Sequence, residues 1–181
     1  MVRRLVQDDL FSGWGIRTLG RREKAYNPIG YHLGTVWPHD NSIIAAGFVK
    51  HGYLEEACKL FSSLVDASTY FPNSRLPEAF AGFSREAFGV PVHYPVACHP
   101  QAWAAGAIPC MLQSLLGFVP DGCSRRLTVR PVLPRFVDWL EFRGLRVADA
   151  RVDLVFTRQS DGRLWVNVEN QEGELDVQVE T

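Results

Sequence analysis

The sequence has no marked excess of either charge and lacks any long apolar run. Its 19 basic and 20 acidic residues give a formal net charge of −1. A chain without a basic patch has no electrostatic footprint for nucleic acid or for an anionic membrane surface. No stretch reaches the length of a membrane span, and acidic residues interrupt the N-terminal segment before a signal-peptide core could form. We therefore expect a cytoplasmic protein that binds neither nucleic acid nor a membrane.

Cysteine is scarce and is not arranged for chemistry with metals. None of the four cysteines forms a CxxC pair, and no His lies at zinc-finger spacing from one. Neither a structural metal nor a redox motif is indicated, so we expect no metal and no cofactor. Cys98 borders the candidate site described below. Its side chain is either a packed thiol, which we favour, or a nucleophile, which would need a setting that stabilises the thiolate.

Apolar residues recur at helical spacing in three segments. The spacing predicts helices over about 39–51, 53–68 and 100–116, with Asp40 or Asn41 capping the first one. The first two helices are joined by a short link and should form an antiparallel hairpin. From Arg125 the apolar residues alternate instead, which predicts an antiparallel β segment. The resulting domains are residues 1–122 and 123–181.

The densest group of chemically active side chains lies between Arg75 and Trp103. A Leu76-Pro77-Glu78 turn supplies a carboxylate, and the run from Pro91 to Trp103 adds two His, a Tyr, a Gln and a Trp. Such a run between periodic segments is typical of a structured loop. Aromatic, amide and carboxylate groups together suit a sugar, which offers an apolar face and a rim of hydroxyls. The alternative is that Pro77 and Glu78 merely begin an exposed helix.

Four motifs in order along the chain carry a family resemblance. They are Gly13-Trp-Gly-Ile-Arg-Thr-Leu19, Tyr31-His-Leu-Gly-Thr-Val-Trp-Pro-His-Asp-Asn41, Leu76-Pro-Glu78 and Tyr94-Pro-Val-Ala-Cys-His-Pro-Gln-Ala-Trp-Ala-Ala-Gly106. Through them the chain resembles bacterial glycogen-debranching-type, amylo-alpha-1,6-glucosidase-like glycoside hydrolases. The resemblance implies a mainly α fold, part of a six-hairpin (α/α) toroid, followed by a small antiparallel β segment.

The resemblance also implies an activity, namely inverting hydrolysis of an α-glucan or α-glucoside. Glu78 would be the general base. The residues expected to line the sugar pocket are Trp37, His39, Asp40, Asn41, Tyr94, Gln101 and Trp103. An inverting enzyme also needs a protonated carboxyl group. The resemblance places this acid in a Gly-Trp-Lys-Asp-like segment that the first eleven residues do not contain, and Asp40 is the alternative acid.

Three helices are too few for a twelve-helix toroid, so we expect the chain to be the C-terminal part of such an enzyme. Exposed helix faces would then favour self-association or binding to a missing N-terminal half. The competing hypothesis is a noncatalytic carbohydrate-binding or regulatory remnant, in which Trp37, Tyr94 and Trp103 stack on a sugar. Independently of these two hypotheses, the alternative to a site role is that Asp40 only caps a helix and that Trp103 only packs in the core.

Overall fold

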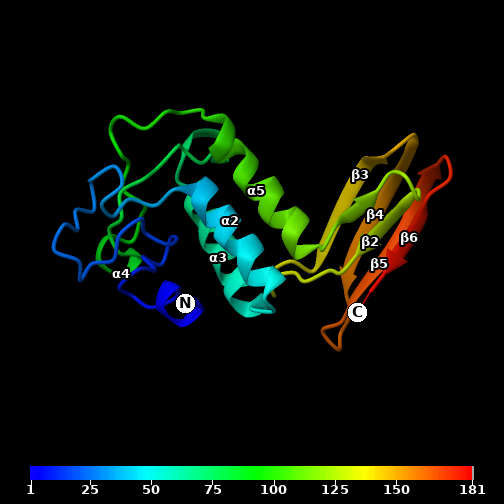
Figure 1. Ribbon diagram of the computed structural model, residues 1–181, viewed down its shortest axis with the longest axis horizontal. Coiled ribbons are helices and arrows are strands. Elements are labelled where there is room, and N and C mark those ends of the chain that lie inside the picture. Colours follow the sequence, from blue (N-terminus) through cyan, green and yellow to red (C-terminus); the bar gives the residue numbers. More distant parts are fainter. Residues whose placement is uncertain (181) are drawn as a thin grey trace. The chain divides into compact units, whose positions relative to one another are not determined.

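The chain folds as an α+β structure in the computed structural model, which describes residues 1–180. Contacts between Cα atoms divide it after Leu112 into an N-terminal unit, Met1–Leu112, and a β unit, Gln113–Thr181 (Figure 1). This division falls ten residues before the predicted boundary at 122: the last turn of a helix, residues 113–115, and the first strand, residues 119–121, both belong to the β unit.

The prediction of a mainly α toroid is wrong. Only 29% of the chain is helical and 24% is strand. The helices of the N-terminal unit are separated by long irregular segments, residues 6–37 and 69–101, which contain no helix longer than four residues. Residues that a toroid would place in further helices form loops here. The C-terminal third is sheet, and the result is a small α+β fold.

The N-terminal unit is organised around a helical hairpin. Helices α2 (Pro38–Lys50) and α3 (Leu54–Ser68) lie side by side, antiparallel (Figure 1). Gly52 turns the chain between them with a φ of 78°, which glycine adopts without strain. Helix α5 (Ala102–Leu115) runs through Pro109. The three predicted helices are thus confirmed to within two residues at each end. The remaining helices are short: α1 (Val2–Leu5), the 3₁₀ turn η1 (Pro72–Ser74) and α4 (Arg85–Phe88).

The predicted cap of α2 is wrong. The helix begins at Pro38, which suits its first position, so Asp40 falls inside the first turn. Trp37 occupies the cap position, and its side chain makes no capping hydrogen bond. The Asn41 side chain is engaged elsewhere, as described below. The helix start is therefore set by proline geometry and by contacts from a distant segment.

Isolated β-bridges hold the irregular segments together. Arg17 pairs with Val36, Val36 with Phe80, and Phe80 with His93. Val36 and Phe80 exchange two backbone hydrogen bonds, of 2.9 and 3.0 Å. These pairs bring the chain before α2 against the chain after Glu78. Four segments that are far apart in sequence therefore meet beside the start of the hairpin.

The β unit contains two three-stranded sheets. One has the order β1 (Val119–Asp121), β2 (Arg126–Val129), β6 (Asp176–Val179), and the other the order β3 (Trp139–Val147), β4 (Ala150–Arg158), β5 (Leu164–Glu172). Most neighbours are antiparallel, but β2 and β6 are parallel, which corrects the prediction of an all-antiparallel segment. After the β3–β4–β5 meander the chain crosses to the other sheet and arrives beside β2 in the same direction.

Both sheets of the β unit share one apolar core. Leu127 and Val129 from one sheet pack in the same cluster as Val152, Leu154 and Phe156 from the other. Burial of such side chains is the main favourable contribution to the stability of this unit. Among residues 1–180, no helix is both long and apolar enough to cross a membrane.

Candidate functional site

Glu78 is a buried carboxylate in the loop region of the N-terminal unit. The residue is 8% exposed. Its backbone N–H donates to the Cys98 carbonyl oxygen, and its Oε2 accepts from the Cys98 N–H, both at 3.0 Å. The loop that contains Cys98 therefore holds both the backbone and the side chain of Glu78. The Leu76-Pro77-Glu78 turn is not the start of an exposed helix.

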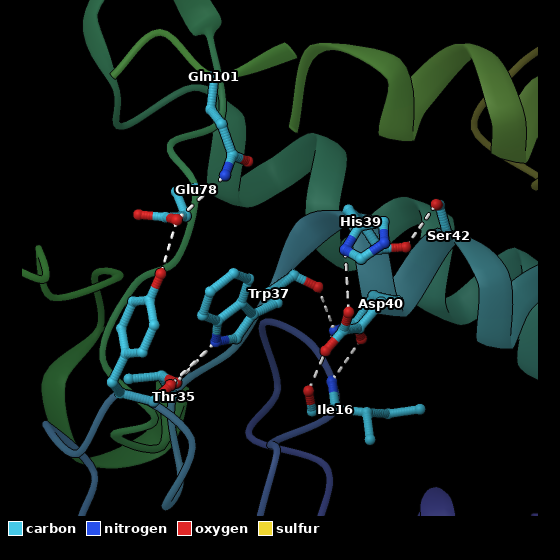
Figure 2. Close-up of polar contacts among 10 residues, drawn as sticks. Ile16, Thr35, Trp37, His39, Asp40, Ser42, Glu78 and Gln101 are labelled. Carbon is cyan, nitrogen blue, oxygen red and sulfur yellow. Dashed lines mark hydrogen bonds and ion pairs between the residues drawn. The ribbon is translucent and has the colours of Figure 1, made fainter. Parts of the chain in front are cut away.

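The second oxygen of Glu78 accepts from two side chains. The Tyr31 hydroxyl donates to Oε1 at 2.7 Å and the Gln101 Nε2 donates at 3.1 Å. Figure 2 shows the Gln101 amide directed at the carboxylate. With the Cys98 N–H, the carboxylate has three donors, and all three are neutral.

These donors fix the charge state of the site. The Tyr31 hydroxyl, followed by the Cys98 backbone N–H, holds the pKa of Glu78 below its ordinary value, because each hydrogen bond stabilises the ionised form. The same bond raises the pKa of Tyr31 to about 12, so the phenol keeps its proton and stays a donor. Glu78 is consequently a carboxylate at neutral pH.

Aromatic rings surround the Tyr31 donor. The Tyr31 ring meets Trp37 edge-on at 4.7 Å and Tyr94 at 5.8 Å between centroids. His32 stacks on Trp37 at 5.0 Å with an interplanar angle of 14°. The indole N–H of Trp37 donates to Thr35 Oγ1 and to the Tyr31 carbonyl oxygen, both at 3.0 Å. The ring of Trp37 is thereby held at a fixed position near the carboxylate.

A second aromatic group lies at the start of α2. The His39 ring stacks on Trp103 at 4.4 Å with an interplanar angle of 24°. His39 Nδ1 lies 2.9 Å from Asp40 Oδ1 (Figure 2). The contact lies outside hydrogen-bond geometry, and His39 Nδ1 is buried without a hydrogen-bond partner among the described residues. Trp103 is 62% exposed and therefore presents its ring to solvent instead of packing in the core.

Asn41 differs from the other predicted residues because it is completely buried. Its Oδ1 accepts from the Ile16 N–H at 2.6 Å, and its Nδ2 donates to the carbonyl oxygens of Ile16 and Trp37 at 3.0 and 2.8 Å. The oxygen and both N–H groups of the Asn41 amide are therefore hydrogen-bonded to the backbone. Asn41 thus joins the N-terminal segment to the start of α2 and positions the residues beside it.

The structure brings the other predicted residues into two groups. Glu78, Gln101, Tyr94 and Trp37 lie around Tyr31, and His39, Asp40 and Trp103 form the second group. Sequence reasoning missed Tyr31, the donor of the shortest bond to Glu78. Its position after the Asn27-Pro28-Ile29-Gly30 turn gave no indication that it reaches a carboxylate 47 residues away.

In the part of the chain that the structure describes, no group of three or more His, Cys, Asp or Glu side chains is arranged to hold a metal ion. Cys98 is exposed, and it contributes its backbone N–H to Glu78. No protein-family model matches the sequence, and no curated protein matches it either.

Proposed function

We propose that the N-terminal unit contributes a sugar-binding site and the general base of a glycoside hydrolase that cleaves an α-glucan or α-glucoside with inversion. The observation that carries the proposal is the Glu78 carboxylate, which three neutral donors keep ionised among exposed and half-buried aromatic rings. A base must be ionised to accept a proton from water. The family resemblance of the sequence motifs supports the choice of substrate.

In this mechanism a water molecule attacks the anomeric carbon while Glu78 accepts its proton. The bond from the anomeric carbon to the leaving oxygen breaks, and a protonated carboxyl group donates a proton to that oxygen. The Gln101 amide and the Tyr31 hydroxyl orient Glu78, and Trp103 and Tyr94 offer ring faces for stacking on sugar. Asp40 is the carboxyl group of this unit to be tested as the acid.

The test is the replacement Glu78→Gln, which keeps the shape of the side chain and removes its basicity. Loss of a general base lowers turnover by about 10²–10⁴-fold. The assay is the hydrolysis of maltotriose and panose, with the product anomer followed by NMR. Glu55→Gln, on the exposed first turn of α3, is the matched control and keeps full turnover.

Three results would contradict the proposal. They are turnover retained by Glu78→Gln, a product with retained configuration, and a wild-type chain that folds and hydrolyses neither sugar. Asp40→Asn tests separately which residue is the general acid. A loss of turnover comparable to that of Glu78→Gln assigns the acid to Asp40, and full turnover assigns it to another carboxyl group.

A second candidate function is noncatalytic carbohydrate binding. The solvent-facing ring of Trp103, stacked on His39, favours it because such a platform binds sugar without any acid. Titration calorimetry with maltoheptaose distinguishes the two. Binding that depends on Trp103 without turnover supports this function, and no heat on a folded sample removes it.

A further inference from the structure

The outer face of the β3–β4–β5 sheet carries two tryptophans in one row. Trp139 on β3 pairs with Thr157 on β4, and Thr157 pairs with Trp165 on β5. Side chains alternate between the two faces of a strand. The neighbouring row of Leu140, Phe156 and Val166 belongs to the core. Both tryptophans therefore point away from the core, with Thr157 between them.

Both rings are open to solvent. Trp139 is 58% exposed and Trp165 is 66% exposed. Neighbouring strands are about 4.8 Å apart, so the two tryptophans are separated by about 10 Å across β4. A ligand several rings long can touch both at once. Two large exposed aromatic side chains in one row of a sheet are typical of a binding surface.

A cavity of about 530 Å³ adjoins Trp165. Its lining includes apolar side chains of Val132, which follows β2, of Leu164 and Val166 on β5, and of Val179 at the end of β6. This volume is in the range of small-molecule sites. By the same alternation Leu164 and Val166 lie on the core face of β5, so the cavity opens around the edge of this strand beside Trp165 and does not extend the row of tryptophans.

The charged groups around this cavity are already neutralised within the chain. Arg163 pairs with Asp161 at 2.6 Å, and Glu180 pairs with Arg130. Arg158 Nε lies 3.8 Å from Asp138 Oδ1, and the Arg158 guanidinium also donates to the carbonyl oxygens of four other residues. An anionic ligand would find no uncompensated cation here, and a cationic ligand would find no uncompensated carboxylate. A neutral ligand with apolar faces and hydroxyl groups is the best match for the surface.

We propose that Trp139 and Trp165 form a platform that binds a neutral α-glucan chain. The sugar rings stack on the two indoles, and the Thr157 hydroxyl and the Asn167 amide of the next row face the hydroxyl rim. The choice of an α-linked glucan rests on the proposed function. The surface itself lies entirely in the β unit.

The experiment is affinity electrophoresis of the whole chain in gels that contain soluble starch, with Trp139→Ala and Trp165→Ala as variants. The wild type is retarded, and each variant has an apparent dissociation constant about tenfold higher. Trp165→Phe, which keeps an aromatic ring, is retarded to an intermediate extent. Near-UV circular dichroism checks that each variant is folded. Phe136→Ala removes an exposed aromatic residue from outside the row and serves as the matched control with unchanged retardation.

The outcomes separate this proposal from the proposed function. If Glu78→Gln loses turnover but still migrates slowly in starch gels, the platform and the proposed function are both supported. If the wild-type chain has no turnover and its retardation depends on Trp139 and Trp165, the platform alone is supported. No retardation of the wild type, or retardation lost only in Trp103→Ala, overturns the platform. Tryptophan variants that reduce self-association and leave retardation unchanged also overturn it, because a second copy would then cover the face.

Discussion

Replacing Asn41 with Ala should destabilise the N-terminal unit more than any ordinary single substitution. The amide is completely buried and makes three hydrogen bonds to the backbone. The Trp37 carbonyl oxygen keeps a second donor, the Asn41 N–H at 3.1 Å, so the loss of its bond to Nδ2 costs about 1 kcal/mol. The N–H and carbonyl of Ile16 lose their side-chain partner in a residue that is 4% exposed.

A buried polar group left without a partner costs about 1–3 kcal/mol. Two such groups and one lost bond give a total of about 3–7 kcal/mol, against a free energy of unfolding of about 5–15 kcal/mol for a typical domain. The matched control is Ser42→Ala. Its hydroxyl makes one bond, to the His39 carbonyl oxygen at 2.6 Å, so its loss should cost about 1 kcal/mol.

Urea titration followed by tryptophan fluorescence gives the free energy of unfolding for both variants. Hydrogen exchange of the Ile16 amide gives a local readout that the β unit does not influence. We expect this amide to exchange much faster in Asn41→Ala and at the wild-type rate in Ser42→Ala. The reasoning is refuted if the two variants are equally stable and the Ile16 amide stays protected.

Two further predictions concern Glu78 and the packing of the loops. Tyr31→Phe should raise the pKa of Glu78 towards its ordinary value, because the first of the hydrogen bonds that stabilise the carboxylate is lost. The ionised Glu78 contributes stability above its unfolded pKa, and this contribution is lost as the pH falls through its folded pKa. In Tyr31→Phe the loss should therefore occur at a higher pH than in the wild type. A ¹³C NMR titration that gives the same pKa of Glu78 in both proteins would contradict this. Gly82→Ala should cost about 3 kcal/mol or more, since a Cβ there would lie 1.6 Å from the Gly34 carbonyl oxygen. Gly106→Ala is the matched control: it lies in α5, a Cβ there has nothing within 4 Å, and the change should raise the midpoint of thermal unfolding. Equal midpoints for Gly82→Ala and Gly106→Ala would contradict the prediction, because the loops around Gly82 would then accommodate the methyl group without cost.

The helices of the N-terminal unit could be predicted because their signals are local. Apolar spacing marks α2, α3 and α5, and Gly52 marks the turn between the first two. The toroid did not follow from these elements. It came from a resemblance carried by loop motifs, and loop motifs do not determine how many helices a chain forms.

The site was only partly predictable, because its contacts join distant segments. Gln101 and the Cys98 loop follow Glu78 closely in sequence, and the density of polar and aromatic residues there indicated the grouping. Tyr31 reaches Glu78 through the Val36–Phe80 bridge, a pairing that no periodicity encodes. The parallel pairing of β2 and β6 was missed for the same reason, since alternation marks a strand but not its neighbour.

The partners of Glu78 support its proposed role as a general base. Asp9 provides the comparison within the same unit: it is 4% exposed, and it pairs with the Arg4 guanidinium and accepts from the Arg22 N–H. A cation compensates the charge of Asp9, as is usual for a buried acid that serves the fold. The three donors that the described residues offer to Glu78 are all neutral, so its negative charge is stabilised but not neutralised. Such a charge is available to a proton or to a ligand hydroxyl, as the proposed function requires.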